Sequence, residues 1–193
     1  MEQNRLTVTR VYTIGHSGHD VRAFFDLLDR HQITILLDVR SAPYSKFVPH
    51  FNKQLLEAEC KTRGIEYRYG GQVLGGRPED AESYRDGQVP DPEMAREKYL
   101  KQVDYLAIMK QQPYRRGIAR LLELAQSAAV VVMCSEGNPV ECHRHHLIAR
   151  SLIDPLVRVT AQAVEVAHIL KEGTLEIVNP DVFVEPPKQL ELF

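Results

Sequence analysis

The chain has 193 residues, of which 44% are hydrophobic and 26% charged, values typical of one globular domain rather than of a disordered or fibrous protein. A formal net charge of -2 excludes a global attraction to nucleic acid or to an anionic membrane, so any such binding must come from a local patch. Three cysteines, the lack of a long apolar run and an N-terminus without a signal-peptide core predict a cytoplasmic protein with no disulfide framework and no membrane partner.

Short apolar runs alternate with amphipathic stretches in the first part of the chain. The runs predict buried strands at residues 11–14, 33–39 and 65–69. Asp20 has the position of an N-cap, because an apolar helical stripe follows it. A second helix is expected over residues 52–63, ending at Gly64.

The second part of the chain continues this alternation. Residues 70–92 predict a long polar loop, and residues 93–127 predict a helical stretch in two pieces broken near Pro113. A fourth buried strand is expected at residues 128–133 and a helix at residues 147–152. Residues 164–170 and 174–178 are expected to pair as a hairpin around Gly173.

This order of elements predicts an α/β fold with a mainly parallel, doubly wound sheet of the Rossmann-like or flavodoxin-like kind. We expect a single domain over residues 1–178, followed by an extended tail over residues 179–193.

Reactive side chains crowd into residues 134–146, CSEGNPVECHRHH, between the fourth strand and the next helix. Two of the three cysteines and three of the eight histidines lie in this segment. Ligands of open α/β sheets bind where strands end in this way, so a chemical site is expected here.

The two cysteines of this segment have three interpretations. Cys134 and Cys142 are buried apolar groups, or Cys142 is a nucleophile whose thiolate is favoured by the helix N-terminus and nearby histidines. Alternatively Cys142 and His146, at i and i+4, bind a metal completed by Cys134 and His16. The spacing matches no standard zinc signature, so no cofactor is implied. Val140 stands where a cysteine-phosphatase loop has arginine, so the segment does not match that loop either.

Polar side chains also follow the first two strands. His16 and Ser17 end the first strand, and Asp38 and Arg40 end the second, so these residues are expected to meet Glu136 at one edge of the sheet. His16 is either a turn residue or a ligand contact. Asp38 and Arg40 either form a structural ion pair or together bind a polar ligand.

Arg144 precedes Ile148 by four residues and should therefore lean toward the sheet edge. There it either binds phosphate or carboxylate or holds the loop through its carbonyl groups; of the two, we favour anion binding. Glu136 is either a general base or a group that orients one.

Basic and aromatic residues interleave over residues 40–53, a pattern that suits a nucleic-acid strand. The basic residues are Arg40, Lys46 and Lys53, and the aromatic ones Tyr44, Phe47 and Phe51. The alternative is an ordinary loop that its aromatics pin to the core. Residues 67–77 and 115–120 have the same ambiguity.

An ordered set of short motifs resembles the domain of unknown function 488 family. The motifs are Thr13-Ile14-Gly15-His16-Ser17, Asp38-Val39-Arg40 with Pro43, Gly64-Ile65 with Leu74-Gly75-Gly76, and Cys134-Ser135-Glu136 followed by Cys142-His143-Arg144. The resemblance spans residues 11–170 and agrees with the α/β prediction. It implies no reaction, but it marks as motif residues His16, Asp38, Arg40, Cys134, Glu136, Cys142, His143 and Arg144. It does not include His145 or His146.

The chain ends in Gln189-Leu190-Glu191-Leu192-Phe193 after two prolines. This pentapeptide resembles the linear motif by which bacterial DNA polymerases and repair proteins bind the replication sliding clamp. Gln189 would bond at the pocket rim, and Leu190, Leu192 and Phe193 would supply the apolar contacts. The alternatives are a tail folded back on the domain or a frayed end.

The leading hypothesis is a cytoplasmic enzyme that acts on a nucleotide, nucleic acid or other phosphate-bearing ligand and is tethered to the clamp for DNA repair. Its catalytic candidates are Cys142, Glu136, Cys134 and His16, and its anion- or substrate-binding candidates are Arg40, Arg144, Asp38, Ser17 and His143. The alternatives are a non-enzymatic nucleic-acid-binding or adaptor protein and a metal-binding or redox protein that uses the cysteine-histidine cluster.

Overall fold

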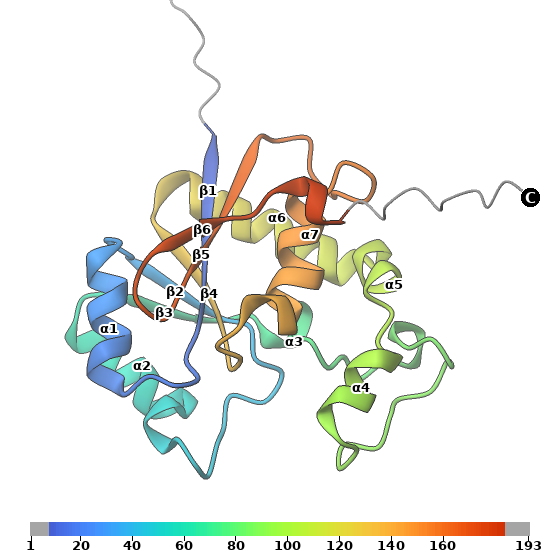
Figure 1. Ribbon diagram of the computed structural model, residues 1–193, viewed down its shortest axis with the longest axis horizontal. Helices are drawn as coiled ribbons and strands as arrows, with labels where there is room; N and C mark the ends of the chain where they lie inside the picture. Colours follow the sequence, from blue (N-terminus) through green and yellow to red (C-terminus); the bar gives the residue numbers. More distant parts are fainter. Residues whose placement is uncertain (1–7, 184–193) are drawn as a thin grey trace, which may run out of the picture.

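Six strands form one sheet in the computed structural model, which describes residues 8–183 (Figure 1). The strands are β1 (Thr9–Gly15), β2 (Ile35–Asp38), β3 (Glu66–Tyr69), β4 (Val130–Cys134), β5 (Val164–Ile169) and β6 (Leu175–Ile177). Their order is β3-β2-β4-β1-β5-β6; the first five are parallel, and β6 is antiparallel to β5. The predicted mainly parallel, doubly wound α/β sheet is therefore confirmed.

Helices α1 (Val21–Arg30) and α2 (Lys53–Thr62) cover one face of the sheet. Asp20 caps α1, because its carboxylate accepts a hydrogen bond of 2.8 Å from the backbone N–H of Ala23, as predicted. Gly64 follows α2 with a φ of 73°, a left-handed conformation that glycine adopts without strain and that ends the helix.

The opposite face is covered by α6 (Gln112–Ser127), a π-helix (Arg144–Ala149) and α7 (Arg150–Ile153), which continues from it. Side chains alternate across β2: Leu36 packs toward α1 and α2, and Ile35 and Leu37 pack toward α6. The helix expected at residues 147–152 thus exists, but it begins earlier and has π geometry in its first six residues. Such π segments are often found at functional sites.

The stretch expected as two helices is three: α4 (Arg96–Gln102), α5 (Tyr105–Lys110) and α6. The additional break has a local cause. The carboxylate of Asp104 accepts hydrogen bonds from the N–H groups of Leu106 and Ala107 and so starts a new helix. Pro113 lies in the first turn of α6, a position that needs no N–H donor.

Residues 70–92 are not simply a polar loop. They contain the short helix α3 (Gly71–Leu74), and Leu74 and Tyr84 are buried in the core. The Tyr84 hydroxyl is 2.6 Å from that of Tyr99, which ties this segment to α4.

The expected hairpin of β5 and β6 is confirmed, with Gly173 at a φ of 87° between the strands. The chain then makes a 3-10 turn, Pro180–Phe183, and the Phe183 ring lies 4.9 Å from that of His145. No helix within residues 8–183 is long and apolar enough to cross a membrane.

A buried polar chain links the sheet to the π-helix. The hydroxyl of Thr13 is 2.7 Å from Nδ1 of His168, and Nε2 of His168 is 3.0 Å from Nδ1 of His145. Burial, with the charges of His145 and Arg144, lowers the pKa of His168 to about 3. Burial, with His146 and Arg144, likewise lowers the pKa of His145 to about 4.

Neutral His168 should make the stability of the fold depend on pH. Because its pKa falls from 6.5 to about 3 on folding, its contribution is complete above about pH 6.5 and is lost as the pH falls toward 3. We expect the free energy of unfolding of the wild type to fall more steeply over this window than that of His168→Gln, measured by urea denaturation. Parallel curves would contradict this assignment.

Candidate functional site

The carboxyl ends of β1, β2 and β4 lie side by side, as the sequence predicted. Gly15 is paired with Cys134, and Asp38 is paired with Met133. The backbone N–H of His16 donates to the carbonyl of Cys134 at 3.1 Å, which continues the pairing past the ends of the strands. The side chains after these strands therefore gather at one rim of the sheet.

Asp38 and Arg40 form a buried bidentate ion pair at the end of β2. Nε and Nη2 of Arg40 donate to the two carboxylate oxygens of Asp38 at 2.9 and 2.7 Å. Tyr67 donates to Asp38 at 2.8 Å, and Arg40 also donates to the carbonyl of Phe51 at 2.8 Å. This geometry favours a structural ion pair over direct binding of a ligand by Asp38 and Arg40.

His16 lies against this pair as a neutral imidazole. Its ring stacks on Phe51 at 4.4 Å, and its Nε2 is 3.3 Å from Nη1 of Arg40. Because a guanidinium only donates, Nε2 is the acceptor and Nδ1 carries the proton. Burial and the charge of Arg40 lower the pKa of His16 to about 4. Ser17 is exposed at the same rim, and its N–H donates to the carbonyl of Ser135 at 3.0 Å.

Two buried thiols meet behind the rim. Sγ of Cys134, at the end of β4, is 2.8 Å from Sγ of Cys142, and the Cys142 thiol is 3.0 Å from Oε2 of Glu136. Burial, the Cys134 sulfur and the Glu136 carboxylate raise the pKa of the Cys142 thiol well above its ordinary value. Cys142 therefore keeps its proton at neutral pH, opposite to the direction expected from a helix N-terminus and nearby histidines.

Arg144 holds the loop between the two cysteines. It is 1% exposed, and its Nη1 donates to Sγ of Cys134 at 2.8 Å and to the carbonyl of Glu136. Its Nη2 donates to the carbonyl of Gly137 at 2.7 Å. These contacts correspond to the clamp on loop carbonyls that was the alternative to anion binding.

Gly15 allows the loop after β4 to pass close to the end of β1. A Cβ at this position would overlap the carbonyl group of Glu136, so only glycine lets the loop cross the end of β1.

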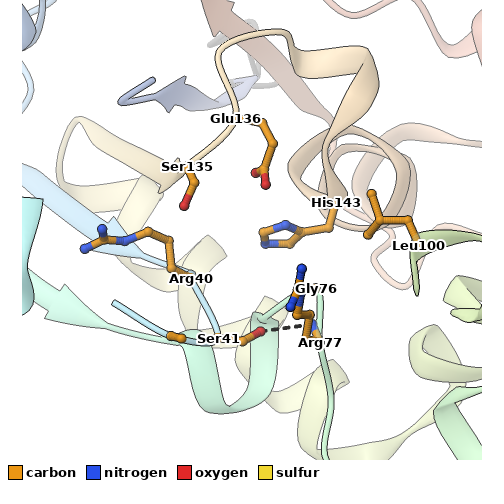
Figure 2. A pocket seen from close by; sticks show the side chains of 9 residues that line it. Arg40, Ser41, Gly76, Arg77, Leu100, Ser135, Glu136 and His143 are labelled. Atoms are coloured by element: carbon orange, nitrogen blue, oxygen red, sulfur yellow. Dashed lines mark hydrogen bonds between the residues drawn. The ribbon is translucent and has the colours of Figure 1, made fainter. Parts of the chain in front are cut away.

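A pocket of about 180 Å³ opens in front of these residues (Figure 2). Its lining residues are Arg40, Ser41, Ala42, Gly76, Arg77, Leu100, Ser135, Glu136 and His143. Figure 2 shows Ser135, Glu136 and His143 directed toward the same space, whereas the guanidinium of Arg40 points away from it. The lining includes neither cysteine, because Glu136 and His143 face the pocket instead.

The second wall of the pocket comes from residues that sequence reasoning did not assign to the site. Arg77 follows α3, and its guanidinium lies 4.6 Å from the centre of the Tyr99 ring. A Cβ at Gly76 would crowd the His143 ring, so glycine is needed where the two segments meet. The available indications were the glycine pair at 75–76 and the basic-aromatic pattern of residues 67–77.

The other two histidines of residues 134–146 lie outside the pocket. His145 belongs to the buried chain with His168, and His146 is exposed, with its Nε2 2.6 Å from the carbonyl of Val140. Within residues 8–183, the histidine, cysteine and carboxylate groups close enough to share a metal ion are Cys134, Glu136 and Cys142, whose ligand atoms all lie within 4.8 Å of one another.

Sequence comparison identifies the family. The profile described as "Domain of unknown function DUF488" matches residues 20–151, more than half of the chain. The chain belongs to this family. The matched span contains Asp38, Arg40, Cys134, Glu136 and the Cys142–Arg144 segment, whereas His16 and Ser17 precede it. No curated protein and no solved structure matches the chain.

The clamp formed by Arg144 should contribute to stability through its geometry and not only through its charge. Arg144→Lys keeps the charge but loses the planar fork, and so leaves buried acceptors unsatisfied. We expect it to lower the free energy of unfolding by about 1–3 kcal/mol in urea denaturation. Arg120→Lys, in an exposed pair with Glu123, is the control and should change it by less than about 0.5 kcal/mol. Equal effects of the two substitutions would refute the clamp.

Proposed function

We propose that this chain is a cytoplasmic enzyme that acts on a nucleotide, a nucleic acid or another phosphate-bearing ligand in the pocket at the ends of β2 and β4. The observation that carries the proposal is the composition of this pocket. A carboxylate, an imidazole and a serine hydroxyl face one small space beside two arginines, with a thiol behind them. A non-enzymatic adaptor would be better served by a filled, apolar rim.

Arg77 is the best-placed group for binding an anion. Arg40 lines the pocket, but its charge is compensated by Asp38, and Arg144 is occupied by the loop. Arg77 is exposed, and the Tyr99 ring orients its guanidinium. In this arrangement Arg40 and Arg144 fix the walls, and Arg77, Ser135 and His143 contact the phosphate.

Glu136 and Cys142 provide the reactive groups. As a nucleophile, Cys142 would need the Glu136 carboxylate, 3.0 Å from its sulfur, as a base. It would also need to turn its side chain toward the ligand, because the thiol lies behind the pocket lining. In the alternative division of labour, Glu136 activates a water molecule and the thiol orients the carboxylate. In both cases Glu136 is the group that moves the proton.

Ser41 and Ala42 line the pocket, and the segment that follows them favours a ligand that contains a nucleobase. Its three aromatic residues differ sharply in exposure: Phe51 is 0% exposed and packs in the core, whereas Tyr44 is 67% and Phe47 is 94% exposed. Of the three aromatic residues, only Phe51 therefore anchors this loop to the core. Two exposed rings beside the basic Lys46 suit the stacking of unpaired bases.

The C-terminal motif Gln189–Phe193 lies outside the described residues. We propose that it binds the replication sliding clamp through Gln189, Leu190, Leu192 and Phe193 and so brings the enzyme to DNA under repair.

Removal of the two exposed rings should weaken ligand binding without unfolding the protein. We expect Tyr44→Ala with Phe47→Ala to reduce the affinity for a dye-labelled single-stranded oligonucleotide at least about tenfold, measured by fluorescence anisotropy. Arg77→Ala should weaken binding and make it less dependent on salt. Leu156→Ala, which removes an exposed apolar side chain elsewhere, is the matched control and should bind like the wild type.

The same oligonucleotide and a set of nucleotides, incubated with the protein and analysed by chromatography, test for turnover. Glu136→Gln should retain ligand binding and lose product formation. Equal binding by all variants, or unchanged product formation by Glu136→Gln, would refute the proposal.

Deletion of residues 189–193 tests the tail separately. We expect the full chain to bind purified sliding clamp in a surface-based binding assay and the truncated chain to lose that binding, with equal thermal stability of both. Equal binding by the two chains would remove the clamp as a partner.

A further inference from the structure

Three metal-binding groups converge where the loop after β4 folds back on itself. Sγ of Cys134, Sγ of Cys142 and a carboxylate oxygen of Glu136 all lie within 4.8 Å of one another, although the cysteines are eight residues apart. Each group is placed by a different element: Cys134 by β4, Glu136 by the loop that Arg144 clamps, and Cys142 by the turn Pro139–Glu141.

The charges at this cluster call for a cation. Two thiolates and a carboxylate would carry three negative charges, and Arg144, which donates to Cys134, supplies one positive charge. In a buried place this excess negative charge is costly unless a further cation compensates it. A divalent ion bound by all three groups makes the cluster and Arg144 neutral together. The N–H donated by Arg144 to Cys134 is also the kind of contact that stabilises a metal-bound thiolate.

The donor set selects the metal. Mg²⁺ and Ca²⁺ prefer oxygen ligands, whereas two sulfurs with one carboxylate suit Zn²⁺. Three protein ligands are the number found in catalytic zinc sites, which keep a fourth position for water or substrate. Glu136 also lines the pocket, so the open side of such a site would meet the space where the ligand binds.

We propose that Cys134, Glu136 and Cys142 bind one Zn²⁺ ion with an open position toward the pocket. Because a tetrahedral ion with Zn–S bonds of about 2.3 Å holds its two sulfurs roughly 3.7 Å apart, the Cys142 side chain must move away from that of Cys134 when the ion binds. The part of the ion in catalysis rests on the proposed function. There the ion would bind a phosphate oxygen of the ligand at its open position and stabilise the negative charge that develops on it, and Glu136 would serve as a metal ligand instead of accepting a proton. The i,i+4 pair of Cys142 and His146 is not part of this site, because His146 points to Val140.

The full chain, purified under reducing conditions without a histidine tag, provides the test. We expect about one zinc per chain by elemental analysis. After removal of the metal by a chelator, Co²⁺ titration should give the thiolate charge-transfer and intense visible bands of a four-coordinate site, and added Zn²⁺ should abolish them. Cys134→Ser and Cys142→Ser should lose these bands. Cys60→Ser should keep them, because Cys60 is buried in the separate core between α2 and the sheet.

Glu136→Gln tests the third ligand with little risk to folding, because the side chain is at the rim and not in the core. We expect it to bind Co²⁺ at least tenfold more weakly, with circular dichroism unchanged. The inference is overturned if the reduced chain binds no metal, if both cysteine variants bind it like the wild type, or if Cys134 and Cys142 form a disulfide in metal-supplied protein. Metal binding without binding of nucleotide or oligonucleotide would leave the zinc site standing and refute the proposed function alone.

Discussion

The buried guanidinium of Arg144 is the interaction on which the site depends. A charged side chain is stable in the core only where hydrogen-bonding partners surround it, and here these are one sulfur and two loop carbonyls. The loop after β4 cannot relax without leaving that charge unpaired. The same contacts therefore fix the approach of Cys142 to Cys134 and direct the Glu136 side chain toward the pocket.

A second buried charge fixes the neighbouring strand. Asp38 holds Arg40 in a bidentate pair, and Arg40 in turn holds neutral His16 against Phe51. The rim thus has two rigid walls that are already polarised before any ligand arrives. Preorganisation of this kind lets an active site stabilise developing charge without rearranging. The π-helix begins at Arg144, whose guanidinium lies beside the ends of β1 and β4.

Local rules predicted most of the frame. The cap at Asp20, the helix end at Gly64 and the hairpin at Gly173 each depend on a few neighbouring residues, so the chain alone revealed them. The convergence of the strand ends followed from the parallel order of the sheet. The break at Asp104 was missed because its capping bonds interrupt an otherwise continuous helical pattern.

The division of labour within the site could not be predicted, because it depends on which of its possible partners each side chain meets in the folded chain. Arg40, Arg77 and Arg144 have similar chemistry in the sequence. In the folded chain Arg40 pairs with Asp38 and Arg144 donates to loop carbonyls, whereas Arg77 is exposed at the pocket. The second wall was hidden for the same reason, since Leu74 and Tyr84 anchor a segment whose composition is polar.

We propose that the rim at the ends of β2 and β4 binds a phosphate-bearing ligand. A crystal structure of the full chain with a nucleoside 5′-monophosphate tests it most directly. The phosphate should lie in the pocket within hydrogen-bonding distance of Arg77 and Ser135, with the base directed toward Tyr44 and Phe47. A nucleotide bound elsewhere on the protein, with this pocket holding only water, would contradict the claim.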